Sequence, residues 1–296
     1  MINSYLIMVK KTLLRKGKVK EVYDLHDGTL EFVFTDNISV FDKRVPTQIP
    51  HKSEVLCRIS TFWFKKCEEI GIKTHFIEAG SNQMRVKKFR IITNYCEINQ
   101  NTTSYMIPLE VIARYYVAGS MYERMKDKGF AYGQQLTKPI VEFTTKFEAY
   151  DRKLTEDEAV DIAGLNKNEA AHIKKTVLEI DSYMNKKVAE RGLIHVDGKK
   201  EFAFDENRTL VVVDTFGTPD EDRFWDSDKY QQNVFEELSK EFVRSYYKKS
   251  GYYGRLIEAR NQGFEEPPLP PLSADMTTKV SDLYIDIYEQ ITGNTF

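Results

Sequence analysis

Alternation and turn signals predict that the chain begins with antiparallel sheet. Residues 12–25 and 29–37 alternate apolar and polar side chains around a turn at residues 26–28, which is the pattern of a β-hairpin. Residues 55–71 place apolar side chains three and four positions apart and stop at Gly71, which predicts an amphipathic helix with a glycine cap. Further strands are expected at 74–79 and 84–93.

The second half of the chain predicts helices between strands. Residues 153–192 have an acidic first turn, a break near Gly164 and a long helical pattern closing at Gly192. Residues 193–220 predict two strands joined by a turn at 205–207. From Lys229 the pattern is that of an amphipathic helix, which is interrupted by the proline-rich residues 265–272 and resumes at Thr277. We expect the proline-rich stretch to be a connector rather than a polyproline ligand for another protein.

The chain is too long for one small module. Its 296 residues exceed the usual size of a single core, and the polar, turn-rich residues 94–105 indicate a hinge or surface insertion. We therefore expect an antiparallel β-rich lobe at 1–105, an α+β lobe at 106–226, and a C-terminal helical segment at 227–296 packed on the second lobe. A homo-oligomer is possible.

Charge and cysteine content narrow the choice of partners. The net charge of −2 gives no global reason to bind nucleic acid or an anionic membrane, and no apolar run approaches membrane-spanning length. Three cysteines without paired short spacing predict reduced, structural thiols. With no basic leader in the opening residues, we expect a cytoplasmic protein, and Met8 is an alternative start to Met1.

Carboxylates on the predicted hairpin at 193–220 are the first candidate for chemistry. Asp197, Lys199 and Glu201 are two residues apart and lie on one face of a strand, and the paired strand can bring Asp214 beside Glu201. Two neighbouring carboxylates on a rigid sheet suit Mg²⁺, which takes oxygen ligands and bridges phosphates. Cross-strand ion pairs on a solvated edge explain the same pattern equally well.

Two other segments carry candidate anion-binding groups. The first, residues 15–23, alternates lysines around Gly17, so that backbone N–H groups and an ammonium could approach phosphates, although lysines also protect solvated edge strands. The second, residues 106–125, holds Glu110 and Arg114 in an apolar strand and ends at Ser120. Arg114 pairs with Glu110 or binds an anionic ligand, and Ser120 is a helix N-cap, a phosphate ligand, or both.

These segments together resemble the SAICAR synthetase (phosphoribosylaminoimidazole-succinocarboxamide synthase) family over nearly the whole chain. The resemblance runs through GKVKEVYDL, TDNISVFD, MIPLEVIARYYVAGS, EFTTKFEAYDRKL, LIHVDGKKEF, TPDEDRFW, PPLPPL and YEQITG. It implies an α+β, two-lobed, ATP-grasp-like architecture with a C-terminal helical appendage, in which residues 1–105 form the nucleotide lobe and residues 106–226 the substrate and metal lobe. It also implies ATP-dependent joining of the carboxylate of carboxyaminoimidazole ribonucleotide (CAIR) to the amine of L-aspartate through an acyl phosphate in purine biosynthesis.

The resemblance assigns roles to residues of this chain. It implies a catalytic set, an ATP-binding set, a Mg²⁺-binding pair and a substrate-binding set. The catalytic set is Lys18, Lys199 and Asp197. The ATP-binding set is Gly17, Lys18, Lys20, Lys87, Met106, Glu201 and Asp214, of which Glu201 and Asp214 hold Mg²⁺. The substrate-binding set is Ser39, Asp42, Glu110, Arg114, Ser120, Lys146, Asp220 and Arg223, in which Arg114, Ser120 and Arg223 hold the ribonucleotide phosphate and Lys146 holds the second carboxylate of aspartate.

The chain departs from the family pattern at several positions. Lys200 stands where an apolar residue is usual, Ala203 where glycine is usual, and Thr215 where glutamate usually follows the strand aspartate. Tyr150 replaces the usual histidine, and residues 89–105 are longer than usual. Two rival functions therefore stay open: another ATP-dependent carboxylate–amine ligase or small-molecule kinase, and a nucleotide-binding regulator that has lost catalysis. A solvated Lys146 is likewise an alternative to aspartate recognition.

Overall fold

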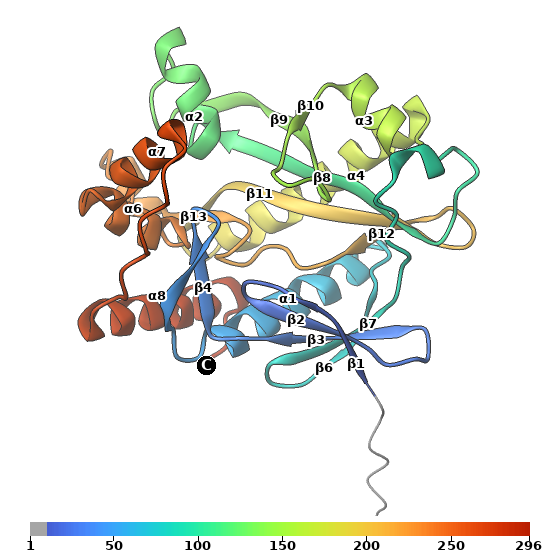
Figure 1. The fold of residues 1–296 in the computed structure, drawn as a ribbon, viewed down its shortest axis with the longest axis horizontal. Helices are drawn as coiled ribbons and strands as arrows, with labels where there is room; N and C mark the ends of the chain where they lie inside the picture. The colour runs from blue at the N-terminus through green and yellow to red at the C-terminus, as the bar shows by residue number, and fades with distance from the viewer. Residues whose placement is uncertain (1–10) are drawn as a thin grey trace, which may run out of the picture.

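The computed structural model describes residues 11–296, in which three antiparallel sheets are combined with eight α-helices (Figure 1). The predicted alternative start at Met8 lies outside these residues. The strands are β1 (Thr12–Lys16), β2 (Lys20–Asp24), β3 (Thr29–Phe34), β4 (Asn37–Val40), β5 (Lys43–Gln48), β6 (Phe76–Ala79), β7 (Gln83–Lys87), β8 (Tyr105–Tyr116), β9 (Gln135–Thr145), β10 (Lys153–Leu154), β11 (Leu193–Phe204), β12 (Leu210–Val213) and β13 (Arg223–Asp226). The α-helices are α1 (Lys52–Glu69), α2 (Gly119–Met125), α3 (Glu156–Ile162), α4 (Lys167–Ala189), α5 (Ser227–Gln231), α6 (Glu241–Lys249), α7 (Tyr252–Gln262) and α8 (Ala274–Thr292).

The first sheet has the order β1-β2-β3-β7-β6 and contains the predicted opening hairpin, with β2 paired to β3 around residues 25–28. The single strand expected at 12–25 is wrong, because a tight turn at Gly17 divides it into β1 and β2. Gly17 N donates to the carbonyl oxygen of Lys20 at 2.9 Å, and a Cβ at Gly17 would lie 2.7 Å from that oxygen. The turn therefore needs glycine.

Helix α1 begins three residues before the predicted start at Val55 and packs between the first sheet and the rest of the molecule. Its buried face includes Val55, Ile59 and Trp63, spaced by four residues as a one-sided stripe requires. Gly71 adopts φ 81° and ends the helix as expected for a glycine cap. Trp63 Nε1 donates to the carbonyl of Gly217 at 3.1 Å, which ties α1 to the segment that follows β12.

The second sheet has the order β10-β9-β8-β11-β12, and β13 pairs with the first half of β11. The hairpin predicted at 193–220 is confirmed as β11 and β12, with Glu201 opposite Val213. Strand β13 was not predicted, because a strand of four residues depends on pairing with a segment that is distant in sequence, here β11. Helix α4 packs against this sheet at β11 and β8 (Figure 1).

Helices α3 and α4 confirm the prediction for residues 153–192. Each begins with a reciprocal capping box, formed by Thr155 with Glu158 and by Asn166 with Glu169, and such boxes satisfy the free N–H groups of a first turn. Gly164 lies between them with φ 56°.

The tail is divided more finely than predicted. The continuous helix expected from Lys229 is wrong: α5, α6 and α7 are separate, because Asn233 and Gly251 adopt left-handed φ values of 63° and 75° that a helix cannot contain. The proline-rich stretch is a connector, as predicted. It is held along its length by the hydroxyl of Tyr247, which donates to the Pro270 carbonyl at 2.6 Å, and by Lys43, which donates to the Pro267 carbonyl at 3.1 Å.

One continuous apolar cluster joins the first sheet, the second sheet and the C-terminal helices. Helix α8 packs mainly along α1 and also touches α4, so the C-terminal segment contacts both of the expected lobes (Figure 1). The division into 1–105, 106–226 and 227–296 stays a prediction. In the part of the chain that the structure describes, no helix is long and apolar enough to cross a membrane.

Candidate active site

A cluster of alternating positive and negative side chains lies where β11 meets β8 and β12. Lys199 Nζ lies 2.6 Å from Glu201 Oε1 and 2.7 Å from Glu110 Oε1 on β8, so the predicted common face of Lys199 and Glu201 is confirmed. Asp214 directly follows β12, whose last residue stands opposite Glu201. The two-residue period of β11 and its register with β12 thus bring the two predicted metal-binding carboxylates into one cluster.

Two lysines from distant segments complete the cluster. Lys20 of β2 forms an ion pair with Asp214. Lys146, which follows β9, forms an ion pair with Glu201 and lies 3.3 Å from Asp214 Oδ2. The Lys146 side chain is 12% exposed, so the alternative of a solvated lysine is wrong. Lys146 lies between the two carboxylates.

Lys18 lies apart from this cluster. Its ammonium is 3.0 Å from Asp42 Oδ1, and its side chain is half-exposed. Asp42 follows β4, the strand that carries Ser39. Gly17 stands in the turn between β1 and β2. The structure therefore brings Lys20, rather than Lys18, to the carboxylates.

Burial and neighbouring charges act in opposite directions within the cluster. Burial opposes ionisation of Asp214, yet the ammonium groups of Lys20, Lys146 and Lys199 hold its pKa well below the usual range. Burial, together with the charge of Asp214, raises the pKa of Glu201. Burial also opposes the charge of Lys199, but the nearby carboxylates of Glu201, Glu110 and Asp214 raise its pKa well above the ordinary value. The cluster thus contains three ammonium and three carboxylate groups, which stabilise one another's charges in a largely buried environment.

An apolar patch adjoins the cluster on the same two strands. Ala203 of β11 packs with Val211 and Val213 of β12, and Phe89 and Met106 cover them. The predicted ATP-binding residue Met106 belongs to this patch. Lys87, also predicted to bind ATP, is exposed and lies 2.8 Å from Glu206 Oε2 in the turn between β11 and β12.

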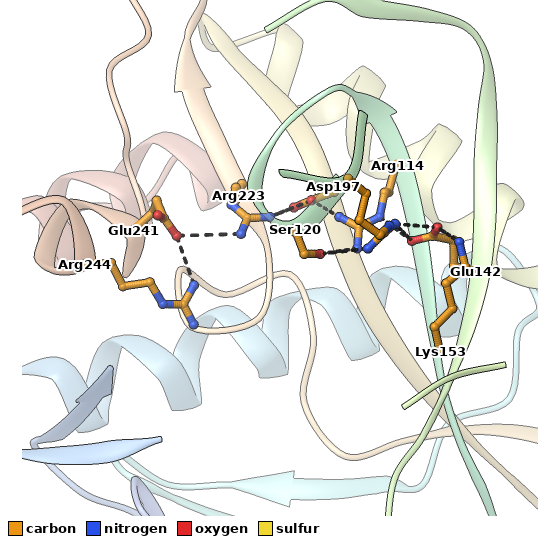
Figure 2. A network of polar contacts seen from close by, with 9 residues as sticks. Arg114, Ser120, Glu142, Lys153, Asp197, Arg223, Glu241 and Arg244 are labelled. Atoms are coloured by element: carbon orange, nitrogen blue, oxygen red, sulfur yellow. Dashed lines mark hydrogen bonds and ion pairs between the residues drawn. The ribbon is translucent and has the colours of Figure 1, made fainter. Parts of the chain in front are cut away.

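A second polar network joins the side chains shown in Figure 2. Arg114 of β8 donates to Glu142 Oε2 at 2.7 Å, to Asp197 Oδ2 at 2.8 Å and to Ser120 Oγ at 3.2 Å. Arg223 of β13 donates to the same Asp197 carboxylate at 2.6 and 2.9 Å. The structure therefore brings together the three residues predicted to hold the ribonucleotide phosphate, Arg114, Ser120 and Arg223, around Asp197.

Two expectations about this network are corrected. Arg114 does not pair with Glu110, because Glu110 accepts from Lys199 while Arg114 bonds to Glu142 and Asp197. Ser120 is not the N-cap of α2, since Ala118 occupies that position. Ser120 instead presents its hydroxyl oxygen to Arg114.

Glycine is favoured where α2 begins. A Cβ on Gly119 would lie 2.3 Å from Arg223 Nη2, and the residue has φ 51°. The Arg223 guanidinium thus rests directly on the backbone next to Ser120.

Positive charge exceeds negative charge in the second network. Arg124 lies 2.8 Å and Lys153 2.5 Å from Glu142 Oε1. At the other end Arg244 lies 3.0 Å from Glu241 Oε2 and Lys248 lies 3.1 Å from Glu241 Oε1. Among residues 11–296, six cationic groups of this network therefore face three carboxylates, those of Glu142, Asp197 and Glu241.

Sequence reasoning missed Glu142, Arg124, Glu241, Arg244 and Lys248, and it considered Lys153 only as a second candidate for recognition of aspartate. The only local signal was the spacing of Ser120 and Arg124, which are four residues apart on a helix and therefore share a face.

Asp220 lies outside both networks. Its carboxylate is buried, 2.8 Å from Lys52 Nζ of α1, and accepts from the Tyr284 hydroxyl of α8 at 2.6 Å. This arrangement is that of a structural pair between helices and the loop after β12, and the structure does not bring Asp220 to the arginines with which it was grouped as a substrate-binding residue.

A fully buried polar group lies beneath β11. Lys200 Nζ is 2.5 Å from Asp181 Oδ1 of α4 and 3.0 Å from Asp222 Oδ2. Asp222 also bonds to His195 Nε2 at 2.8 Å and accepts from Gly217 N at 3.1 Å. Lys200, one of the departures from the family pattern, thus points away from Lys199 and Glu201 and fixes the loop that connects β12 to β13.

Comparison with known proteins decides the family. The SAICAR synthetase family model matches residues 13–258. The chain belongs to the SAICAR synthetase family. A phosphoribosylaminoimidazole-succinocarboxamide synthase of Thermoplasma acidophilum is 50% identical over 293 residues, covering 95% of this chain and 98% of the relative, and that of Thermoplasma volcanium has the same identity and coverage.

Solved structures of SAICAR synthetases have the same fold. A SAICAR synthetase (Type-2) in complex with ADP is 29% identical with a TM-score of 0.71, covering 95% of this chain and 98% of that one. The enzyme from Saccharomyces cerevisiae complexed with SAICAR has a TM-score of 0.77 at 24% identity and covers 98% and 97%. The expected fold class is confirmed, as is the expected function as an ATP-dependent ligase of purine biosynthesis.

Two other departures from the SAICAR synthetase pattern are the long segment 89–105 and Tyr150. The long segment 89–105 folds back on itself, since Arg90 N donates to Ser104 O at 3.2 Å and Met106 N donates to Arg90 O at 2.9 Å. Its far end rests on the turn at Gly164, where a Cβ would meet the Asn99 backbone at 2.8 Å. Tyr150 is 75% exposed.

Proposed function

We propose that this chain joins CAIR to L-aspartate with cleavage of ATP, and that the lysine–carboxylate cluster on β11 and β12 is where the carboxylate is phosphorylated. ADP bound to a relative of the same fold supports nucleotide binding. A carboxylate acylates an amine only after activation, because oxide is a poor leaving group; phosphorylation supplies a good one.

The unpaired, buried thiols of Cys57 and Cys67 support a reducing compartment, the cytoplasm.

Glu201 and Asp214 fit Mg²⁺. Both offer anionic oxygen, and Glu201 Oε2 is buried with the ammonium of Lys146 as its partner among residues 11–296. Mg²⁺ is commonly held by one or two carboxylates and completes its shell with water and substrate phosphates, so a pair rather than a larger protein cage is the expected donor set. When bound, the ion would neutralise phosphate charge at this place.

The three lysines of the cluster supply the remaining positive charge. Lys20 and Lys146 hold the carboxylates that Mg²⁺ would take, so their ammonium groups would turn to the ATP phosphates as the ligands bind. Fixed cations around a transferring phosphoryl group are the main source of catalysis in such reactions. Lys199, held by Glu110 and Glu201, is placed to meet the CAIR carboxylate. The position of Lys146 favours this role over recognition of aspartate.

The arginine network is the proposed site of the ribonucleotide phosphate. Arg114 and Arg223 both bind the Asp197 carboxylate, and their planar forks suit phosphate as well as carboxylate. The excess of cations over carboxylates leaves charge for a dianion, and Ser120 adds a hydroxyl. Burial opposes the charge of Glu142, but Lys153 and Arg114 keep its pKa low, at about 2, so Glu142 remains an anchor for the arginines.

The apolar patch is the proposed seat of the adenine ring. Phe89 and Met106 cover the aliphatic side chains of Ala203, Val211 and Val213, and a flat, mostly apolar ring gains from such contact. The patch adjoins Glu201 and Asp214 on the same strands, so the triphosphate would extend from it to the cluster.

Replacing Lys20 by alanine should lower kcat for SAICAR formation more than replacing Lys18 does. Lys20 forms an ion pair with Asp214, whereas Lys18 pairs with Asp42 in solvent. Steady-state rates of both variants at saturating substrates, with Lys16→Ala as an exposed control, measure the difference. Equal losses in Lys18→Ala and Lys20→Ala would contradict the assignment.

The test of the proposed function is phosphate release by the purified chain. Release should require both CAIR and L-aspartate and should give SAICAR in equal amount. A small-molecule kinase would consume ATP with CAIR alone and accumulate a phosphorylated product, and a regulator that has lost catalysis would bind ATP without turnover. Either result would contradict the proposed function and support the corresponding alternative.

A further inference from the structure

Glu221 is a carboxylate that none of the assignments above uses, in the loop between β12 and β13. Its Oε1 accepts from the Thr215 hydroxyl at 3.1 Å, and its Oε2 accepts from the Thr218 hydroxyl. Both hydrogen bonds come from neutral groups, so the carboxylate is oriented without being neutralised. The residue is half-buried, which leaves it within reach of a substrate.

The loop puts Glu221 next to the reaction site. Thr215, its donor, directly follows the cluster residue Asp214. Lys199, which we place at the CAIR carboxylate, and Lys240 at the start of α6 are the cations whose charges reach Glu221, and Asp220 is the neighbouring anion. A carboxylate that is held by the residue directly after Asp214, and that carries no ion pair of its own among residues 11–296, is placed to face the incoming amine.

We propose that Glu221 accepts the proton that the amino group of L-aspartate must lose before it attacks, an inference that rests on the proposed function. The ammonium gives one proton to Glu221. The neutral amine then forms the C–N bond with the acyl carbon, and the C–O bond to phosphate breaks. Phosphate leaves with the bonding electron pair and takes the second nitrogen proton, and Glu221 returns its own proton to water.

The contact with Thr215 supports this role. The Thr215 hydroxyl, on the residue that directly follows Asp214, points to the carboxylate of Glu221. The loop therefore holds a carboxylate next to the lysine–carboxylate cluster. Burial and the charge of Asp220 raise the pKa of Glu221 to about 7, where a base is most effective near neutral pH.

The decisive experiment compares two acceptors in Glu221→Gln. With L-aspartate at pH 7, kcat should fall at least tenfold, since positioned bases contribute roughly 10²–10⁴-fold, and the rise of the wild-type rate with pH through about 7 should disappear. Hydroxylamine is a neutral amine at that pH and needs no base, so CAIR- and ATP-dependent hydroxamate formation should stay near the wild-type rate. Glu236→Gln, which removes an exposed carboxylate paired with Lys229, is the matched control.

Each other outcome has a definite meaning. Equal losses with aspartate and hydroxylamine would show that Glu221 only supports the site, and an unchanged aspartate rate would show that it takes no part; both overturn the inference. A wild-type protein that forms neither product would refute the proposed function instead. As a second variant, Thr215→Glu/Glu221→Ser should recover at least tenfold over Glu221→Ser, and failure to recover would also overturn the inference.

Discussion

Replacing Asp214 by asparagine, or Glu201 by glutamine, is expected to lower the rate of SAICAR formation by at least about 10²–10³-fold, the loss typical when one preorganised electrostatic group is removed. Each change keeps the volume of the side chain and removes an anionic oxygen ligand for Mg²⁺. It also frees Lys20 or Lys146 from the carboxylate that positions it. Steady-state rates at saturating substrates and a range of Mg²⁺ concentrations measure the effect.

The control for this pair is Glu206→Gln. Glu206 lies in the turn of the same hairpin and pairs with Lys87 at the exposed edge, so its loss should leave the rate unchanged. Circular dichroism and thermal unfolding should show that all three variants keep the fold. A wild-type rate for Asp214→Asn or Glu201→Gln at limiting Mg²⁺ would refute the metal assignment.

The largest expected effect on stability belongs to Lys200. Lys200→Met should lower the free energy of unfolding by about 3–5 kcal/mol, because removing one partner from a buried ion pair leaves an uncompensated charge. Asp181 and Asp222 would lose the ammonium that lies 2.5 and 3.0 Å away. Denaturant unfolding of wild type and variant measures the difference.

Two further measurements separate this cause from lost packing. Without the ammonium, the folded-state pKa of Asp181 and Asp222 rises, so the folded protein binds more protons and the deficit should shrink as the pH falls from 8 toward 5. Adding Asp181→Asn to Lys200→Met should recover part of the loss. Lys174→Met, which removes a surface ion pair with Glu156, should change stability by no more than about 1 kcal/mol.

Local patterns predicted the hairpin of β11 and β12 because alternation fixes which side chains share a face, and a turn fixes the register. Alternation alone therefore grouped Lys199 and Glu201 correctly. The partners Lys20 and Lys146 could not be grouped with them, because they come from β2 and from the end of β9, and no local period relates those segments to β11. Local sequence also failed to identify the partners of Arg114. Glu110 lies four residues away from Arg114 in the sequence, yet Arg114 bonds to Glu142 and Asp197 instead.

Short elements were missed for a different reason. Strand β13 has only four residues and exists because β11 offers it a partner. The breaks between α5, α6 and α7 depend on left-handed residues such as Asn233, a conformation that asparagine tolerates but does not require. The departure at Thr215 was visible in the sequence. The hydrogen bond between Thr215 and Glu221 was not, because it depends on the conformation of the loop between β12 and β13.

The pairing of Asp220 with Lys52 and Tyr284 has a consequence for how the protein is made. Tyr284 lies in α8, which is synthesised after every strand of both large sheets, and its hydroxyl holds the carboxylate that precedes Glu221 and Arg223 along the chain. A nascent chain whose α8 is still inside the ribosome cannot place this helix against α1. Assembly of the active site must therefore wait until α8 has emerged, and no shorter nascent chain is expected to be active.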